Sequence, residues 1–275
     1  MLMLCACLPA VVHASPAVTL RTSFAPNKLG ASTTIAFGFQ ILTPSGETPT
    51  PLTSLNLHLP AGMGLAATTL GQANCEPAAL IAHGLDGCSP NARLGYGEAS
   101  IEVPLGPVIV HETAKITVFV GPVSGQNTQV LFYAEGWRPI FAQLVFPGQM
   151  LPDAAPFGGR IETAVPLVPT VPDAADATVI RFQSTIGPSH LTYYKRVNGQ
   201  LVPYRPAGVA IPRVCPPGGF PFAADFGFHD GSSVSATSSV ACPAAHASAR
   251  GRSRGRRSQR THARHKRSAL RSHTT

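Results

Sequence analysis

Short runs of alternating apolar and polar residues, separated by glycine and proline, recur along most of the chain. The clearest run is 220–228, in which every second residue is phenylalanine or alanine. Successive side chains of a strand point to opposite faces of a sheet, so this spacing predicts a half-buried strand. The 26 glycines and 27 prolines among 275 residues interrupt helices and mark turns. The pattern predicts an all-β protein.

Further runs of this kind predict a series of short strands with turns between them. Asn198-Gly199 is a strong signal for a type I′ hairpin turn. Short strands at such close spacing are typical of a β-sandwich. The expected strands cover residues 17–22, 32–42, 53–60, 94–103, 114–120, 128–135, 141–146, 177–186, 220–228 and 234–240.

The proline-rich segment 165–176 predicts a boundary between two sheets or two subdomains. We therefore expect a β-sandwich domain with a cysteine loop at 15–165 and a second β unit at 166–245. The second unit ends in a hairpin between two cysteines. One β-sandwich and two packed β subdomains both fit this pattern.

The first residues of the chain resemble an export signal. Residues 1–12 are apolar, and Val12-His13-Ala14 has the small residues of a cleavage site, so 1–14 is predicted to be a signal peptide. The run is too short to span a bilayer. A lipoprotein signal ending at Cys5 and a buried first strand are the alternatives. The expected location is secreted or at the cell surface.

Four cysteines follow this predicted leader, and an even number in an exported chain favours disulfides. Three pairings are possible. The preferred one joins Cys75 to Cys88 and Cys215 to Cys242, because each pair brackets a self-contained loop or hairpin. A zinc site is disfavoured, since no close pair of cysteines has the usual ligand spacing. Within the first loop, Pro77 predicts a short helix that ends at Gly84 or Gly87.

The net charge of +8 is distributed very unevenly along the chain. Residues 250–271 hold ten Arg and Lys and no acid, which leaves eleven basic and thirteen acidic residues upstream. Residues 246–275 have too little apolar surface to fold, so a disordered tail is expected. Such a tail can bind a polyanion in a salt-dependent manner. The candidate residues are Arg250, Arg252, Arg254, Arg256, Arg257, Arg260, Arg264, Lys266, Arg267 and Arg271.

Segments of the first half resemble a module of exported actinobacterial surface proteins. The segments are LNLHLPAGM, NCEPAALIAHG, GCSPNARLGYGEASIEVPLG and ITVFVGP, within residues 52–145. Cys75, Cys88 and Gly95 match the module, whereas Ser89 replaces its usual proline, which follows at Pro90. The resemblance implies export and an immunoglobulin-type sandwich of uncharacterised role, and it brings no catalytic residues.

No catalytic motif is evident in the sequence. G-x-S-x-G, H-E-x-x-H and a glycine-rich phosphate loop are all missing from it. Glu98 and Glu102 share one face of a predicted strand, which we interpret as a solvated face rather than a glycosidase pair. The chain is expected to need no cofactor or metal and to have no enzymatic activity.

Aromatic and basic residues flank the Asn198-Gly199 turn and form a possible binding surface. They could stack on a sugar or grip an acidic polymer, although cations also protect an exposed edge hairpin from aggregation. These candidates are Tyr193, Tyr194, Lys195, Arg196 and Tyr204.

The sequence thus favours an exported, non-enzymatic β-sandwich protein that associates with an anionic cell-envelope polymer through its tail. A carbohydrate-binding or carbohydrate-cleaving module is the first alternative, with a glycan as its partner. A nucleic-acid-binding protein is the second alternative.

Overall fold

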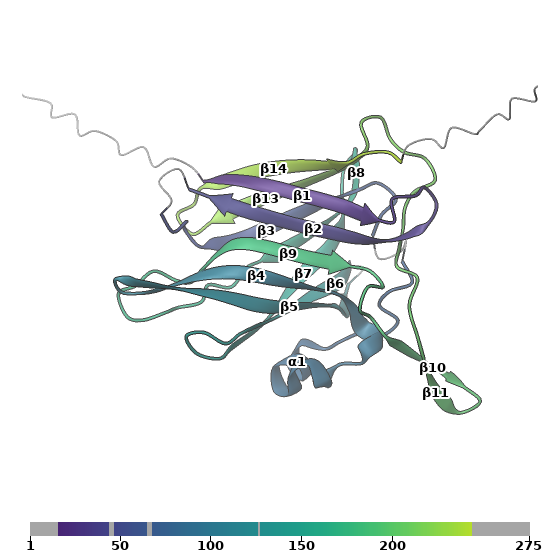
Figure 1. Cartoon of the computed structure of the whole chain (residues 1–275), viewed down its shortest axis with the longest axis horizontal. Coiled ribbons are helices and arrows are strands. Elements are labelled where there is room, and N and C mark those ends of the chain that lie inside the picture. The colour runs from purple at the N-terminus through teal and green to yellow at the C-terminus, as the bar shows by residue number, and fades with distance from the viewer. Residues whose placement is uncertain (1–15, 44–46, 65–67, 126, 244–275) are drawn as a thin grey trace, which may run out of the picture. The chain divides into compact units, whose positions relative to one another are not determined.

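Antiparallel strands dominate the computed structural model of the chain, as the alternating runs predict (Figure 1). The structure describes residues 16–43, 47–64, 68–125 and 127–243. The predicted signal peptide and all ten basic residues of the predicted tail lie outside these ranges. The strands are β1 (Ala17–Ala25), β2 (Ser32–Leu42), β3 (Leu52–Pro60), β4 (Arg93–Leu105), β5 (Val108–Ser124), β6 (Asn127–Gly136), β7 (Ala142–Pro152), β8 (Phe157–Ala164), β9 (Thr178–Ile186), β10 (Tyr193–Val197), β11 (Gln200–Tyr204), β12 (Val209–Ala210), β13 (Phe220–Phe228) and β14 (Ser233–Val240).

Twelve of these strands form one sheet that nearly closes on itself. Their order is β1-β2-β9-β4-β5-β6-β7-β8-β3-β13-β14, and β12 pairs with β2. The two ends of this order lie side by side (Figure 1), where the hydroxyl oxygens of Thr22 and Ser238 are 2.9 Å apart. Asn27 Nδ2 also donates to the carbonyl oxygen of Ala241. The all-β class and the sandwich-like shape are confirmed, with one sheet contributing both layers.

Strands from either side of the proline-rich segment 165–176 belong to this same sheet. β9 lies between β2 and β4, and β13 lies beside β3. Their pairing is regular, as in Phe39 opposite Phe182 and Leu57 opposite Ala224. Strands from both sides of this segment therefore share one sheet and contribute to one main hydrophobic core.

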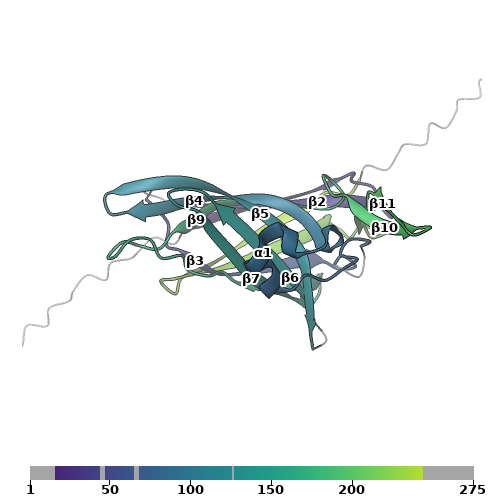
Figure 2. The same ribbon diagram turned by 90° about the horizontal axis from the view of Figure 1, so that it is seen from below.

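The cysteine loop forms a small helical cover on the outside of the sheet. Helix α1 (Pro77–His83) begins with the predicted proline and ends at Gly84, whose φ of 59° suits glycine. Two 3₁₀ turns follow, at Gly84–Gly87 and Pro90–Ala92. Seen from below, α1 lies over the outer face of β5, β6 and β7 (Figure 2). Leu80 is fully buried there in a second, smaller core.

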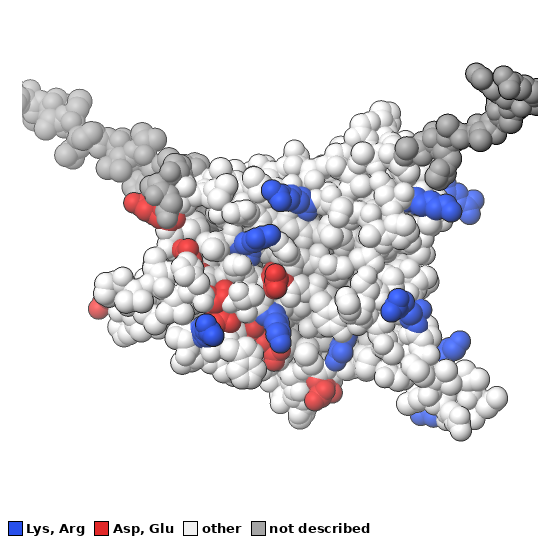
Figure 3. Space-filling view, in the orientation of Figure 1, with Lys and Arg blue, Asp and Glu red and all other residues white. Residues whose placement is uncertain are grey.

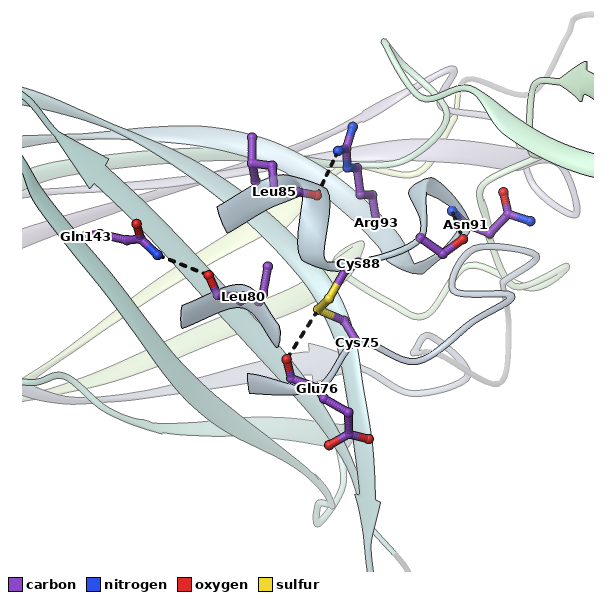
Figure 4. Close-up of a disulfide and its surroundings, with 9 residues drawn as sticks. Cys75, Glu76, Leu80, Leu85, Cys88, Asn91, Arg93 and Gln143 are labelled. Carbon is purple, nitrogen blue, oxygen red and sulfur yellow. Dashed lines mark hydrogen bonds between the residues drawn. A yellow bond between two sulfur atoms is a disulfide. The ribbon is translucent and has the colours of Figure 1, made fainter. Parts of the chain in front are cut away.

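The first disulfide holds this cover in place. Cys75 and Cys88 are bonded, as predicted, with their Cα atoms 5.3 Å apart (Figure 4). The Cys75 amide donates to the carbonyl of Val120 on β5, and Gln143 Nε2 donates to the carbonyl of Leu80. The segment is therefore tied to β5 and β7 as well as to itself.

The second predicted disulfide is also present, between Cys215 and Cys242, with Cα atoms 5.8 Å apart. It closes the β13–β14 hairpin from outside its two strands. β13 alternates strictly between buried and half-buried residues, as its sequence predicts. The Asn198-Gly199 turn between β10 and β11 has positive φ at both residues, which confirms the type I′ assignment.

Candidate ligand cavity inside the sheet

An apolar cavity of about 260 Å³ lies on the inner side of the sheet. Aliphatic and aromatic side chains make up most of its wall. Several are only half-buried although they point inward, because the space in front of them is unfilled. Examples from β3, β7 and β8 are Leu55, Leu57, Leu59, Leu144, Met150 and Ile161.

A row of small residues across four neighbouring strands explains why this space is open. Ala99 on β4 faces Ala114 on β5, and Gly136 on β6 faces Ala142 on β7. The register of β5 with β6 places Ala114 opposite Gly136, so the four form a continuous row. All four line the cavity. Side chains this short cannot reach the opposite wall, so the space between the walls stays open. Protein interiors are otherwise close-packed and contain few voids of this size.

One acidic side chain, Glu112, sits in the cavity wall beside this row. It precedes Ala114 by two residues on β5 and therefore points to the same inner face. Its Oε1 accepts a hydrogen bond from the Trp137 amide at 3.1 Å. A Cβ added to Gly136 would lie 3.5 Å from Glu112 Cγ, at ordinary van der Waals distance, so Gly136 directly borders this side chain.

The other carboxylate oxygen of Glu112 is unsatisfied. The residue is only 8% exposed, and Oε2 has no hydrogen-bond partner among the described residues. Arg138 also lines the cavity but forms no ion pair with any residue in the described ranges. A buried carboxylate oxygen without a partner is costly, because it loses hydration and gains no hydrogen bond in return.

The cavity wall reaches the surface at Arg138 and Pro166, which are both exposed. Arg138 belongs to the β6–β7 loop, where Trp137 is 64% exposed and its ring lies 4.7 Å from that of Phe141. Pro166 follows β8. We define the mouth as this end of the sheet, where β4 turns into β5 and β6 into β7.

The connecting segments at the mouth are mainly acidic. Their only Lys or Arg is Arg138, against four acids. In Figure 3 most acidic side chains lie toward this end, together with several Lys and Arg, whereas only Lys and Arg are seen at the end beside β10 and β11. The four acids are Glu47, Asp173, Asp176 and Asp230.

A second polar cluster lies on the outer face, where His58 of β3 is held between two carboxylates. Its Nδ1 lies 2.6 Å from Asp153 Oδ2 and its Nε2 lies 2.9 Å from Asp225 Oδ2. Partial burial would lower the pKa of His58, but the hydrogen bonds and charges of both aspartates outweigh it and raise that pKa above 6.5. Ser235 Oγ donates to Asp225 Oδ1, not to the imidazole, so this is no nucleophile–base pair.

The sequence places His58 on a polar strand face but does not reveal its two partners. Asp153 and Asp225 are far from it in the chain, and only the pairing of β3 with β8 and β13 brings them together. The hydrogen bond from His58 lowers the pKa of Asp153 below 3.8. Burial would raise the pKa of Asp225, but its bonds from Ser235 and His58 outweigh burial and lower it.

The predicted binding hairpin is at the opposite end from the mouth. Tyr193 is fully buried, and its hydroxyl accepts from the Gly71 amide and donates to the Arg93 carbonyl. Burial raises the pKa of this phenol. Its ring packs edge-on against Tyr204 at 5.9 Å, so both tyrosines anchor the hairpin.

The other three candidates of this hairpin stay at the surface. Lys195 Nζ lies 5.7 Å from the Tyr204 ring centre, while Tyr194 and Arg196 are exposed. The structure therefore brings together Tyr193, Tyr204 and Lys195. It leaves Tyr194 and Arg196 as the side chains that are free to meet a partner.

The remaining acidic candidates do not form a paired site. Glu98 is exposed on β4. Glu102 accepts a hydrogen bond from Thr48 Oγ1 at 2.6 Å. Over the described ranges, no group of His, Cys, Asp and Glu side chains is arranged to hold a metal ion.

Among the described residues, no helix has both the length and the apolar character needed to cross a membrane. The chain matches no known family model, and neither curated proteins nor solved structures gave a match. The cavity and its acidic side chain are thus the features on which a functional assignment can be based.

Proposed function

We propose that the sheet binds an elongated apolar molecule in its interior. The observation that supports this most directly is the row of small side chains, Ala99, Ala114, Gly136 and Ala142, which faces an unfilled, mostly hydrocarbon wall. Ligand sites are typically concave, mostly apolar and provided with a few polar groups. Apolar cavities of about 150 Å³ already bind benzene or xenon, and this one measures about 260 Å³.

The distribution of packing supports a binding cavity rather than a random defect. An unfilled interior loses dispersion contacts and lowers the free energy of unfolding. Four adjacent strands contribute small residues at the same level of the sheet, whereas Ile101, Ile116 and Leu144 at neighbouring inward positions are larger; Glu112 and Ala134 are the other two neighbours. The void is therefore a regular feature of the register.

The direct test is a fluorescence titration of the purified protein with diphenylhexatriene. This rod-shaped hydrocarbon has no hydrogen-bonding group and fluoresces strongly only in apolar surroundings. We expect saturable binding of one molecule per chain, and we expect Ala114→Leu to abolish it by filling the cavity.

Ala36→Leu is the matched control, because it adds the same atoms to the half-buried outer face of β2. It should bind the probe like the wild type, with circular dichroism confirming that both variants are folded. Absence of saturable fluorescence in the folded wild type would refute the proposal, as would equal binding by Ala114→Leu.

A second candidate function rests on the charge distribution. Ten of the 21 Lys and Arg lie in residues 250–271, while the rest of the chain is slightly acidic. We propose that an exported form associates with an anionic cell-envelope polymer through this segment; the two disulfides are the structural feature that favours export. Deleting residues 249–275 should release the protein from isolated envelopes in low salt. Unchanged retention across a salt series would exclude this role.

A further inference from the structure

We infer that the cavity takes a single-chain amphiphile with a cationic amine head, and that Glu112 receives that head. This inference rests on the proposed apolar cavity and adds the chemistry of the ligand. Its basis is the carboxylate oxygen Oε2 of Glu112, a residue that lines the cavity; this oxygen is buried and lacks a partner within the described part of the chain.

The surroundings of Glu112 determine what could satisfy this oxygen. Oε1 is already held by the Trp137 amide, which fixes the carboxylate in one orientation. The rest of the nearby wall consists of small apolar residues such as Ala114 and Gly136. A buried water normally needs two to four polar partners, and such a wall offers few. A donor carried on an apolar body would satisfy Oε2 and fill the void at once.

Charge favours an ammonium over a hydroxyl as that donor. Hydrogen bonds between ionised groups are stronger than those between neutral ones. The segments around the mouth carry four acids and one Arg, which attracts cations to the entrance. Arg138 is exposed, so water screens its charge, whereas Glu112 is buried and dominates the field inside the cavity.

The same features exclude an anionic head. A fatty carboxylate in this position would place a second negative charge beside an unpaired one in a poorly solvated site. The inferred order of affinity is therefore amine, then alcohol, then carboxylate, for chains of equal length.

The inference is tested by displacing diphenylhexatriene with dodecylamine, dodecanol or dodecanoate, each below its critical micelle concentration at pH 7. Dodecylamine should bind about 10-fold to 100-fold more tightly than dodecanoate, as expected for a charge-assisted hydrogen bond. Glu112→Gln keeps the acceptor for the Trp137 amide and nearly the same volume, so the variant should still bind the probe. In this variant the preference for the amine should fall to about 1-fold to 3-fold.

Glu102→Gln is the control, because it removes one negative charge from a neighbouring strand but on the outer face. It should leave the preference for the amine unchanged. The inference is overturned if dodecanol or dodecanoate binds as tightly as dodecylamine, or if Glu102→Gln reduces the preference as much as Glu112→Gln. Failure of the probe itself to bind would refute the cavity proposal instead, so the two outcomes are distinguishable.

Discussion

The two halves of the sheet use their inward faces in opposite ways. In the filled half, formed by β1, β2, β13 and β14, phenylalanines occupy the interior and touch one another. Phe39 and Phe226 have ring centres 5.0 Å apart, and Phe24 and Phe220 are 5.5 Å apart. In the hollow half, formed by β3 to β8, alanine and glycine replace large residues at one level and leave the cavity.

This difference indicates which half provides stability and which half is available for binding. Edge-to-face aromatic contacts add to the free energy gained by burying the rings. The hollow half has the stacked pair of Phe132 and Phe146, with ring centres 5.3 Å apart. It is also reinforced from outside by α1 and the Cys75–Cys88 disulfide, which cover β5, β6 and β7. A binding cavity can therefore persist without the sheet losing its shape.

The largest expected contrast comes from removing one phenylalanine from each half. Phe226→Ala should lower the free energy of unfolding by about 3 to 5 kcal/mol, because Phe226 is fully buried among other rings. Phe146→Ala should cost about 1 to 2 kcal/mol, since this ring is half-buried and borders existing space. Urea unfolding of both variants measures the difference, and equal costs would contradict the division into two halves.

Removing the disulfides should affect the two halves alike. Replacing either pair, Cys75 with Cys88 or Cys215 with Cys242, by alanine should cost about 3 kcal/mol on the chain-entropy account. The closed loops have similar lengths on a logarithmic scale, with separations of 13 and 27 residues. Chemical denaturation of the two double variants tests this. A much larger loss for one pair would show that the halves differ in more than their packing.

Adding side-chain volume should also destabilise the filled half more than the hollow half. Ala224→Leu on β13 should destabilise the protein by about 1 to 3 kcal/mol, because Ala224 is fully buried in the filled half. Ala114→Leu should be tolerated within about 1 kcal/mol, because the added atoms enter the cavity. Thermal unfolding of the two variants compares them directly. Strong destabilisation by Ala114→Leu would indicate that the cavity is not available in solution.

The smallest expected effect concerns the His58 cluster, which joins the halves on the outer face. Because the pKa of His58 is raised in the folded protein, its contribution to the free energy of unfolding is complete below about pH 6.5. This contribution is lost as the pH rises through the raised pKa. Because the pKa values of Asp153 and Asp225 are lowered, the contribution of these two carboxylates to the free energy of unfolding is lost only as the pH falls below about 3.8. Between these limits the cluster stabilises most.

The wild type should therefore lose up to about 1 kcal/mol relative to His58→Gln between pH 6 and pH 8. Arg160 lies 3.8 Å from Asp153 and itself forms an ion pair with Glu162, so it shares the field of this cluster. Parallel urea titrations at the two pH values give the comparison. Identical pH profiles for wild type and variant would show that His58 is not coupled to folding.

The strands of the filled half could be predicted because alternating apolar residues indicate which side chains point into the core. Alternating phenylalanine on β13 has one reasonable interpretation, and the structure confirms it. β8 was missed because Phe157-Gly158-Gly159 lacks alternation and follows a proline. Its place between β7 and β3 depends on tertiary pairing that no local pattern shows.

The cavity was beyond prediction for a related reason. Ala99, Ala114, Gly136 and Ala142 are unremarkable alone and form a row only when four strands are in register. One signal was available. Glu112 interrupts the inward apolar positions of β5, and a charged residue at such a position indicates a candidate functional site. The sequence pattern predicts a strand that begins only at Ala114, so it places Glu112 outside the strand.

The contrast between the halves can be tested most directly by diffraction from crystals of the protein pressurised with xenon. Xenon occupies apolar cavities without requiring any particular chemical group. We predict xenon density beside Ala99, Ala114 and Gly136, and none between the rings of Phe24, Phe39 and Phe226. A hollow half that takes up no xenon, with side chains closed over the row of small residues, would contradict the account.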